Sequence, residues 1–215
     1  MKIESFPRKL FLFRNNLCMF AQTQNELHNM KHMSILAVSL LALVACTPEK
    51  KQEADYSQYV NPMIGTDFTG NTYPGAQVPF GMVQLSPDNG LPGWDRISGY
   101  FYPDTTIAGF SHTHLSGTGA GDLYDISFMP VTRPYKEAPA PLGIYSTFSH
   151  NDEAASAGYY RVLLKDYNIN VELTATERCG IQRYTFPEAE ASVFLNLKKA
   201  MNWDFTLDSK IEVVD

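Results

Sequence analysis

The sequence predicts an all-β protein, folded as an antiparallel β-sandwich. Residues 168–175 and 192–197 alternate polar and apolar side chains, as half-buried strands do. Residues 210–213 alternate in the same way. Glycine, proline, asparagine and aspartate separate these stretches, and no convincing helical pattern follows Cys46. Strands without intervening helices favour two packed antiparallel sheets.

The other strands are predicted from shorter signals. Residues 81–85 and 125–129 each show a brief period of two. Residues 159–164 and 183–186 consist of residue types that favour strands. The aromatic content of 13% suits such a protein, and it also suits a sugar binder, because pyranose rings pack on aromatic faces.

Residues 30–46 are predicted to be a lipoprotein signal peptide. An apolar run from Ile35 to Ala45 is too short for a transmembrane helix and ends at Cys46. The last four residues, 43–46 (LVAC), resemble the lipobox of bacterial lipoproteins. We therefore expect Cys46 to be lipidated and to anchor the protein to a membrane, on the periplasmic side or at the cell surface. The alternative is a buried apolar strand with a stray cysteine.

The position of this signal peptide sets the boundaries of the segments before and after it. Met30 is the more natural start, so we expect residues 1–29 to come from a misplaced start codon. Residues 47–55 form a polar tether, and residues 56–215 form the sandwich domain. The domain stops inside the strand predicted at 210–213, as a chain truncated at its C-terminal end would. Cys179 is the one cysteine of this part, which leaves no internal disulfide, and we expect a buried, inert thiol.

The charge of the chain excludes one class of partner. Its net charge is -6, and nucleic-acid binding needs basic patches. We therefore expect no nucleic acid among its partners.

A loop-rich stretch from about residue 59 to residue 130 carries the residues that suit a binding site. Its centre is the run 110–119, in which His112 and His114 stand one residue apart beside glycines. In a strand both imidazoles would share a face and could ligate a metal. No cysteine or carboxylate has a familiar zinc spacing nearby, so a polar contact to substrate is favoured, with a structural hydrogen-bonding role as the alternative. We predict no metal ligands in this chain.

Trp94 and Asp95 lie in a loop rich in glycine and proline, where they could form a sugar platform with its hydrogen-bonding carboxylate. The alternative is an aromatic plug over the edge of the sandwich. Five aspartates in this stretch could pair as glycosidase carboxylates, although their turn-like settings favour backbone hydrogen bonds for most of them. They are Asp67, Asp88, Asp104, Asp122 and Asp125.

Several long motifs in order resemble the amino-terminal domain of glycoside hydrolase family 92, the calcium-dependent α-mannosidases. The motifs are NPMIGT at 61–66, YPGA at 73–76, VPFGMVQLSPD at 78–88, SGY at 98–100, GFSHTHLSGTG at 109–119, GYY at 158–160 and VELTAT at 171–176. Gln182 replaces a histidine and Asn196 replaces an aspartate that we would expect from the family.

The resemblance implies a β-sandwich that packs against a helical (α/α) barrel, with the active site between them. It implies exo-hydrolysis of α-mannosides, α-1,2-linked in our expectation, with inversion and with calcium as the cofactor. The general acid, the general base and most calcium ligands would belong to the barrel, which this chain lacks, so it would have no catalytic residue of its own. The partner would be a mannose-containing glycan, contacted by Gly65, Thr66, Tyr73, Trp94, Asp95, His112 and His114.

Two other hypotheses remain beside the sandwich half of a secreted α-mannosidase. The chain could be a stand-alone carbohydrate-binding lipoprotein without catalysis. It could also be a non-functional fragment, because the surface that would face the barrel is left exposed.

Overall fold

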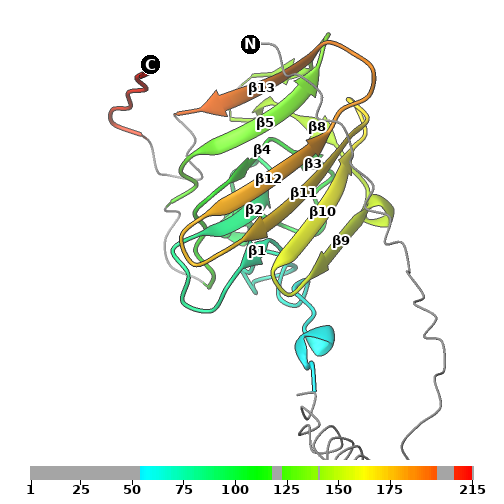
Figure 1. Cartoon of the computed structure of the whole chain (residues 1–215), viewed down its shortest axis with the longest axis vertical. Helices are drawn as coiled ribbons and strands as arrows, with labels where there is room; N and C mark the ends of the chain where they lie inside the picture. Colours follow the sequence, from blue (N-terminus) through cyan, green and yellow to red (C-terminus); the bar gives the residue numbers. More distant parts are fainter. Residues whose placement is uncertain (1–53, 118–122, 140, 198–205, 215) are drawn as a thin grey trace, which may run out of the picture. The chain divides into compact units, whose positions relative to one another are not determined.

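The protein is a sandwich of two antiparallel sheets, as the sequence predicts (Figure 1). The computed structural model describes residues 54–117, 123–139, 141–197 and 206–214. The expected signal peptide with Cys46, and residues 1–29, lie outside these ranges. None of the helices in the described ranges is long and apolar enough to cross a membrane.

The larger sheet has five strands in the order β1-β2-β4-β5-β13, and every pair is antiparallel. Its strands are β1 (Ala76–Gln77), β2 (Gln84–Asp88), β4 (Gly109–Ser111), β5 (Ser127–Thr132) and β13 (Ala191–Asn196). The second sheet lies in the chain between β5 and β13. The segment before β1 and the connections β1–β2, β2–β4 and β4–β5 carry residues of most of the motifs singled out in the sequence.

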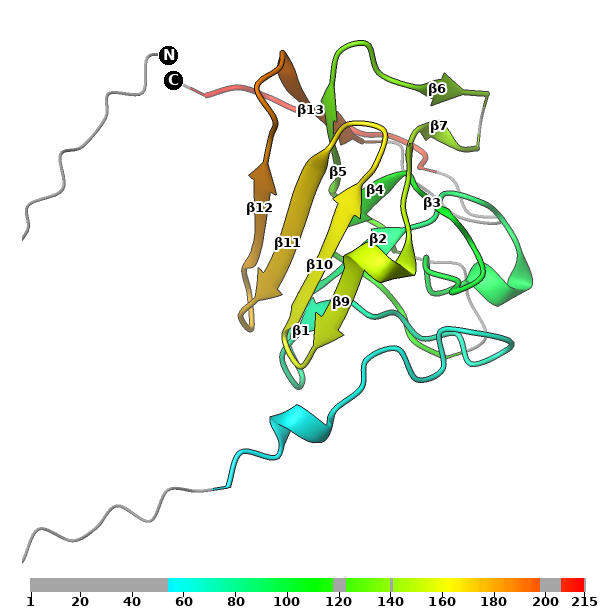
Figure 2. The same ribbon diagram turned by 90° about the vertical axis from the view of Figure 1, so that its right-hand side faces the viewer.

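The second sheet is a four-stranded meander in the order β12-β11-β10-β9. Its strands are β9 (Glu153–Ser156), β10 (Tyr159–Leu164), β11 (Ile169–Ala175) and β12 (Gly180–Thr185). The hairpin between β10 and β11 turns at Asn168, which has a φ of 52°, a left-handed conformation that asparagine tolerates. The two sheets face each other in Figure 2.

Short elements complete the described parts. Two small two-stranded sheets pair β3 (Thr106–Ile107) with β8 (Ser146–Thr147), and β6 (Glu137–Ala138) with β7 (Gly143–Ile144). Three turns of 3₁₀ helix are η1 (Ser57–Tyr59), η2 (Trp94–Arg96) and η3 (His150–Asp152).

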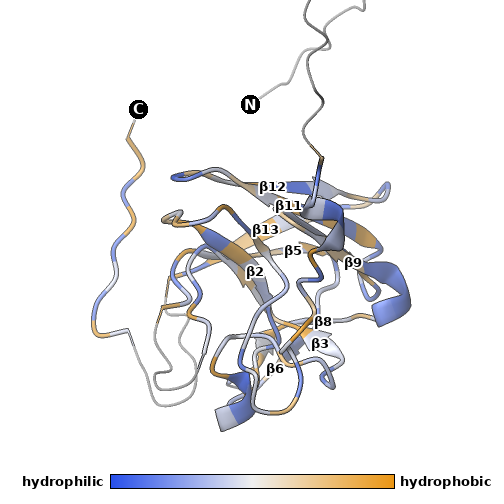
Figure 3. Ribbon diagram, turned by 90° about the horizontal axis from the view of Figure 1, so that it is seen from below, coloured by the Kyte–Doolittle hydropathy of each residue, from blue (hydrophilic) through white to orange (hydrophobic). Residues whose placement is uncertain are grey.

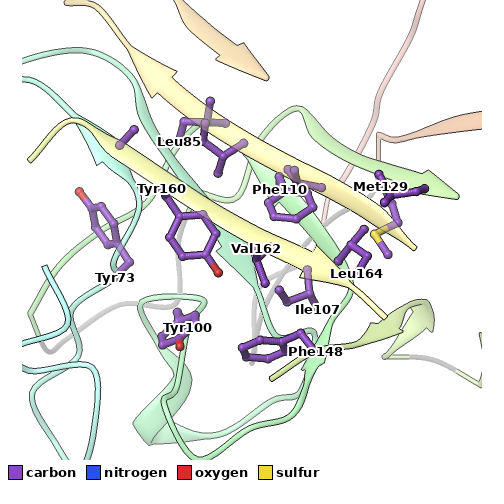
Figure 4. Packing of buried hydrophobic residues seen from close by; sticks show 14 of the residues in the cluster. Tyr73, Leu85, Tyr100, Ile107, Phe110, Met129, Phe148, Tyr160, Val162 and Leu164 are labelled. Atoms are coloured by element: carbon purple, nitrogen blue, oxygen red, sulfur yellow. The ribbon is translucent and has the colours of Figure 1, made fainter. Parts of the chain in front are cut away.

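The core lies between the sheets and follows from the alternation of β10 and β11. Tyr160, Val162 and Leu164 project from β10 toward the five-stranded sheet, where Phe110 lies in Figure 4. Ile169, Val171 and Leu173 do the same from β11. Their neighbours along each strand point outward and are only partly buried or exposed. Burying one face of each sheet gives the sandwich its main stabilisation.

Two sequence-based predictions are wrong. Residues 206–214 contain no strand, so the strand predicted at 210–213 does not form. Figure 3 shows polar and apolar residues mixed along this segment, and its Ile211 and Val213 are exposed. The alternation is present, but no neighbouring strand offers it a ladder of hydrogen bonds. Cys179 is exposed, because it lies in the turn between β11 and β12, where its N–H binds Thr176.

Candidate functional site

A pocket of about 390 Å³ collects residues from five of the sequence motifs. They are the motifs at 61–66, 73–76, 78–88, 109–119 and 158–160, and the last two are distant in sequence from the first three. The lining residues are Val60, Asn61, Pro62, Ile64, Thr72, Tyr73, Gly75, Gln77, Pro79, Ser116, Ser156, Ala157 and Gly158. The lining is mixed, with hydroxyl, amide and aromatic groups, which is the composition that suits a neutral polar ligand.

Tyr73 forms the wall between this pocket and the interior. Its hydroxyl donates to Gln77 Oε1 at 2.7 Å, and its ring packs against the His114 ring with centroids 5.2 Å apart. Burial raises the pKa of Tyr73 to about 12. The phenol therefore stays protonated near neutral pH and acts as a hydrogen-bonding group, not as a base.

Gly65 and Thr66 support the pocket without lining it. The Gly65 carbonyl accepts the Thr72 N–H at 3.3 Å, and a Cβ at Gly65 would lie 2.9 Å from Thr72 Oγ1. The Thr66 hydroxyl donates to the Met63 carbonyl at 2.9 Å. These contacts fold residues 61–72 into a compact loop that presents Thr72 to the pocket.

Gly75 allows the opposite wall to close. A Cβ at this position would lie 2.2 Å from the Leu85 carbonyl oxygen, so no side chain fits between this residue and β2. The close approach explains why the sequence has glycine here. It also brings Tyr73 and Gln77 to the edge of the five-stranded sheet.

Trp94 and Asp95 lie outside the pocket lining. They belong to η2, and the Trp94 side chain is 52% exposed. Arg96 fixes this turn through two hydrogen bonds to Asp104, at 2.6 Å and 2.5 Å, and its guanidinium lies 4.6 Å from the centre of the Phe101 ring. A rigid, exposed indole fits a platform for a ring better than it fits an aromatic plug.

His112 and His114 do not share a face, because β4 ends at Ser111 and the chain turns after it. The side chains of His114 and its partner Asp88 are both 0% exposed. Nδ1 of His114 lies 2.7 Å from the Gln84 carbonyl oxygen, and Nε2 lies 2.8 Å from Asp88 Oδ1. This position supports a structural role for His114, and it does not fit the sugar contact expected from the sequence.

His112 faces a second space. Its Nδ1 donates to the Ile126 carbonyl at 3.0 Å, and its ring meets Phe128 edge to face. A pocket of about 340 Å³ opens beside it, and its lining residues are His112, Phe128, Gly180, Gln182, Tyr184 and Val193. The two histidines therefore cannot act on one ligand together.

Sequence reasoning missed several residues of the first pocket. Thr72 and Ser116 line it directly, next to motif residues that were chosen, and Asn61 and Gln77 offer amide groups. Asn61 and Ser116 lie inside the motifs, and Thr72 and Gln77 lie directly beside one, which was the available signal. Asp88 and Asp104 were expected in turns, but they are buried and paired with His114 and Arg96.

The described residues do not form a metal centre. Within them, no group of three or more histidine, cysteine, aspartate or glutamate side chains could hold an ion. They therefore do not fit the calcium that the family resemblance implies.

Comparison with known proteins identifies the family. The model of the glycosyl hydrolase family 92 N-terminal domain matches residues 59–215. An uncharacterized secreted glycosidase from Arthroderma benhamiae is 26% identical over 172 residues, which cover 75% of this chain and 21% of the relative.

Two solved structures support the match. A family GH92 α-mannosidase from Bacteroides thetaiotaomicron, in complex with mannoimidazole, is 44% identical with a TM-score of 0.64, over 68% of this chain and 20% of that chain. An inverting GH92 mannosidase from the same species is 31% identical with a TM-score of 0.53, over 66% and 20%. The chain thus spans about a fifth of the length of these relatives. It belongs to glycosyl hydrolase family 92, and it matches the N-terminal domain of that family.

Proposed function

We propose that this chain is the sandwich part of a secreted exo-α-mannosidase that releases terminal mannose with inversion. The relatives described as an α-mannosidase and as an inverting mannosidase support the reaction. The glycosidase from Arthroderma benhamiae, which is described as secreted, supports the location. A preference for α-1,2-linked mannose is part of the proposal.

One observation carries this function: the 390 Å³ pocket joins motifs that are distant in sequence. Its rim is apolar and uncovered, since Val60 is 53% and Ile64 72% exposed. Beside it, Phe80 is fully exposed at the tip of the β1–β2 hairpin. An exposed apolar rim around a polar pocket is typical of a site that a second domain closes. We assign the (α/α) barrel to that place.

In this proposal the chain binds mannose and does not cleave it. An inverting glycosidase needs an acid and a base about 6.5–9.5 Å apart on opposite sides of the sugar. The pocket lining contains no aspartate or glutamate among the described residues. The Thr72 hydroxyl, which donates to the Ile64 carbonyl, accepts from a sugar hydroxyl, the Asn61 amide nitrogen donates to one, and Ser116 can do either. Tyr73 offers an aromatic wall. Trp94 and Asp95 contact the part of the glycan beyond the terminal mannose.

Calcium and the membrane complete the proposal. We assign the calcium ligands to the barrel, because calcium needs several hard oxygen donors and the described residues offer no cluster of them.

We also propose that a lipidated Cys46 anchors the protein to a membrane in the periplasm or at the cell surface. Replacing Cys46 by serine would then release it from the membrane fraction.

The proposal is tested with a chimaera. This chain replaces the matching segment of the 44% identical relative, so that the remainder of that enzyme supplies the acid and base. We expect the chimaera to release mannose from α-1,2-mannobiose in the presence of calcium, whereas the 215-residue chain alone releases none. Release by the chain alone would contradict the assignment of catalysis to the barrel. A folded but inactive chimaera would contradict the proposed reaction.

A stand-alone carbohydrate-binding role is the second candidate. It is favoured by the fact that residues of this chain alone form the pocket. In that case the isolated chain would bind methyl α-mannoside with an affinity that the addition of a barrel does not change. Calorimetric titration of the chain and of the chimaera separates the two candidates.

A further inference from the structure

A second carboxylate–histidine pair, with a buried carboxylate, lies outside the pocket lining, at the start of the strand β9 that contributes Ser156 to the pocket. Glu153 begins β9, and its side chain is 1% exposed. The hydroxyl of Tyr160 donates to Glu153 Oε1 at 2.5 Å, and the hydroxyl of Tyr100 lies 3.0 Å from both of its carboxylate oxygens. Nδ1 of His150 lies 2.6 Å from Oε2. The carboxylate is therefore surrounded by donors.

The tyrosines of this cluster are permanent donors. Burial and the neighbouring Glu153 charge raise the pKa of Tyr100 and of Tyr160 above the usual range of tyrosine. Both phenols keep their protons at any pH at which the domain works. Both hydroxyls donate to Glu153, whose Oε2 also lies next to His150 Nδ1.

His150 lies between two acceptors. On its other side, Nε2 lies 2.7 Å from the Tyr102 carbonyl oxygen, which can only accept. Each ring nitrogen of His150 therefore faces an acceptor oxygen, on Glu153 on one side and on Tyr102 on the other. The Tyr102 ring stacks on it at 3.9 Å with an angle of 6°, and Phe148 meets it edge to face at 5.2 Å. These contacts fix the imidazole in one orientation.

The residue whose carbonyl His150 contacts, Tyr102, also reaches the pocket loop. The Tyr102 N–H donates to the Thr66 carbonyl at 2.8 Å, and the Ser98 hydroxyl donates to the Thr72 carbonyl at 3.0 Å. Residues 98–102 are thus the support on which the loop 61–72 rests. Beside these bonds, the Thr72 side of the pocket wall is held by contacts within its own loop and by the Gly117 N–H, which donates to the Asn71 carbonyl at 2.7 Å.

We propose that His150 is a positioning residue for the sugar pocket: anchored by buried Glu153, it fastens the Tyr102 peptide and thereby fixes the 61–72 loop. The expected effect of His150 on mannose binding rests on the proposed function. The connection from His150 through Tyr102 to the loop 61–72 does not depend on any ligand. His150 is 31% exposed and outside the pocket lining, so a variant there leaves the sugar-contacting groups unchanged.

The test uses the 215-residue chain and the variant His150→Phe. Phenylalanine keeps the stacking on Tyr102 and the contact with Phe148 but removes both donors. Amide hydrogen exchange is followed at Thr66, Thr72 and Tyr102, with Val162 and Val171 as reporters of the core. We expect exchange at the loop amides to rise about tenfold, as for the loss of one hydrogen bond to a charged group. Exchange at the core amides should stay within about twofold of the wild type.

Tyr102→Phe is the matched control, because it keeps the stacked ring and the backbone carbonyl, and it should leave all rates unchanged. His150→Gln retains one donor and should give an intermediate rate at Thr66. Nitrogen-15 shifts of the His150 ring in the wild type should show both nitrogens protonated. If His150→Phe is folded and its loop amides exchange at the wild-type rate, or if loop and core rates rise together, His150 does not position the loop.

Titration with methyl α-mannoside separates this inference from the proposed function. If both hold, His150→Phe weakens binding about five- to tenfold, as expected when a wall of the site loses its order. If the wild-type chain binds no mannoside, the sugar site is contradicted, while the exchange data still decide the role of His150. Faster loop exchange with unchanged mannoside affinity would show that His150 orders the loop but not the binding site, which overturns its role in positioning the pocket.

Discussion

The meander β9–β12 and the loops of residues 61–117 are held together in different ways. The meander buries apolar side chains on alternate positions, and six residue pairs in register join β10 to β11. The loops also bury polar pairs, namely Asp88 with His114 and Asp104 with Arg96, whereas the buried carboxylate of the meander, Glu153, lies at the very start of β9. The loops also hold Phe68, Asn71 and Phe80 at positive φ. Apolar packing gives a regular sheet, whereas buried polar pairs give irregular loops with one defined shape.

This difference suits the two regions to different tasks. Apolar packing is non-directional and tolerates changes of side chain that conserve volume. A buried charge pair tolerates few changes, because removal of one partner leaves the other uncompensated. A binding site needs a defined shape more than it needs average stability. Accordingly, the loops that form the pocket are held by buried polar pairs, in which substitution of either partner is poorly tolerated.

The largest expected effect comes from breaking the buried pair in the loops. Asp88→Ala removes no apolar contact of the meander, but it leaves the buried His114 Nε2 with the Ser111 hydroxyl, at 3.2 Å, as its remaining side-chain partner. We expect a loss of about 3–5 kcal/mol in the free energy of unfolding. Urea denaturation followed by far-UV circular dichroism measures it. The double variant Asp88→Ala/His114→Leu should recover part of the loss, and a loss below about 1 kcal/mol for Asp88→Ala would mean that the pair does not hold the loops.

The matching change in the meander removes packing and no charge. Leu173 is buried on β11, and Leu173→Ala should lower the free energy of unfolding by about 2–4 kcal/mol through lost burial and the cavity left behind. The loss of stability should affect both strands equally, so amide hydrogen exchange should become faster to the same extent in β10 and in β11. An effect confined to the loops would contradict the distinction between the two regions.

A smaller effect is expected where the two regions meet. A Cβ at Gly180 on β12 would lie 2.7 Å from His112 Cδ2. Gly180→Ala should therefore displace the His112 ring and destabilise the domain by about 1–2 kcal/mol, as overpacking does. The His112 ring proton resonances should shift while those of His114 stay in place. Equal shifts at both rings would show that the two histidines are coupled.

The sequence predicted the meander well because its signal is local. The strand predicted at 168–175 is β11 to within one residue, and 159–164 is β10. Alternation indicates which face of a strand is apolar. In β10 and β11 the apolar face is buried in the core and the other face is partly buried or exposed, as expected. The same signal failed at 210–213, because alternation does not tell whether a neighbouring strand is present. It also could not show that Cys179 lies in an exposed turn.

The loops were predictable only in composition. The motifs indicated a site, and Tyr73 does line the pocket. The role of His114 was out of reach, because its partners Gln84 and Asp88 stand 30 and 26 residues away in the sequence. No local pattern distinguishes an imidazole that will be buried by such partners from one that will face a ligand. Long-range pairing decided the outcome for both histidines.

The central claim, that the pocket beside Tyr73 is the sugar site, is tested most directly by a nuclear magnetic resonance titration of the chain with methyl α-mannoside. We predict saturable shifts at the amides of Thr72, Tyr73, Gly75 and Ser116, with none at Gly180, Gln182 or Tyr184 of the second pocket. Tyr73→Ala should abolish these shifts while the spectrum of the meander is unchanged. Saturable shifts at the second pocket, or none at the four pocket amides in a folded chain, would contradict the claim.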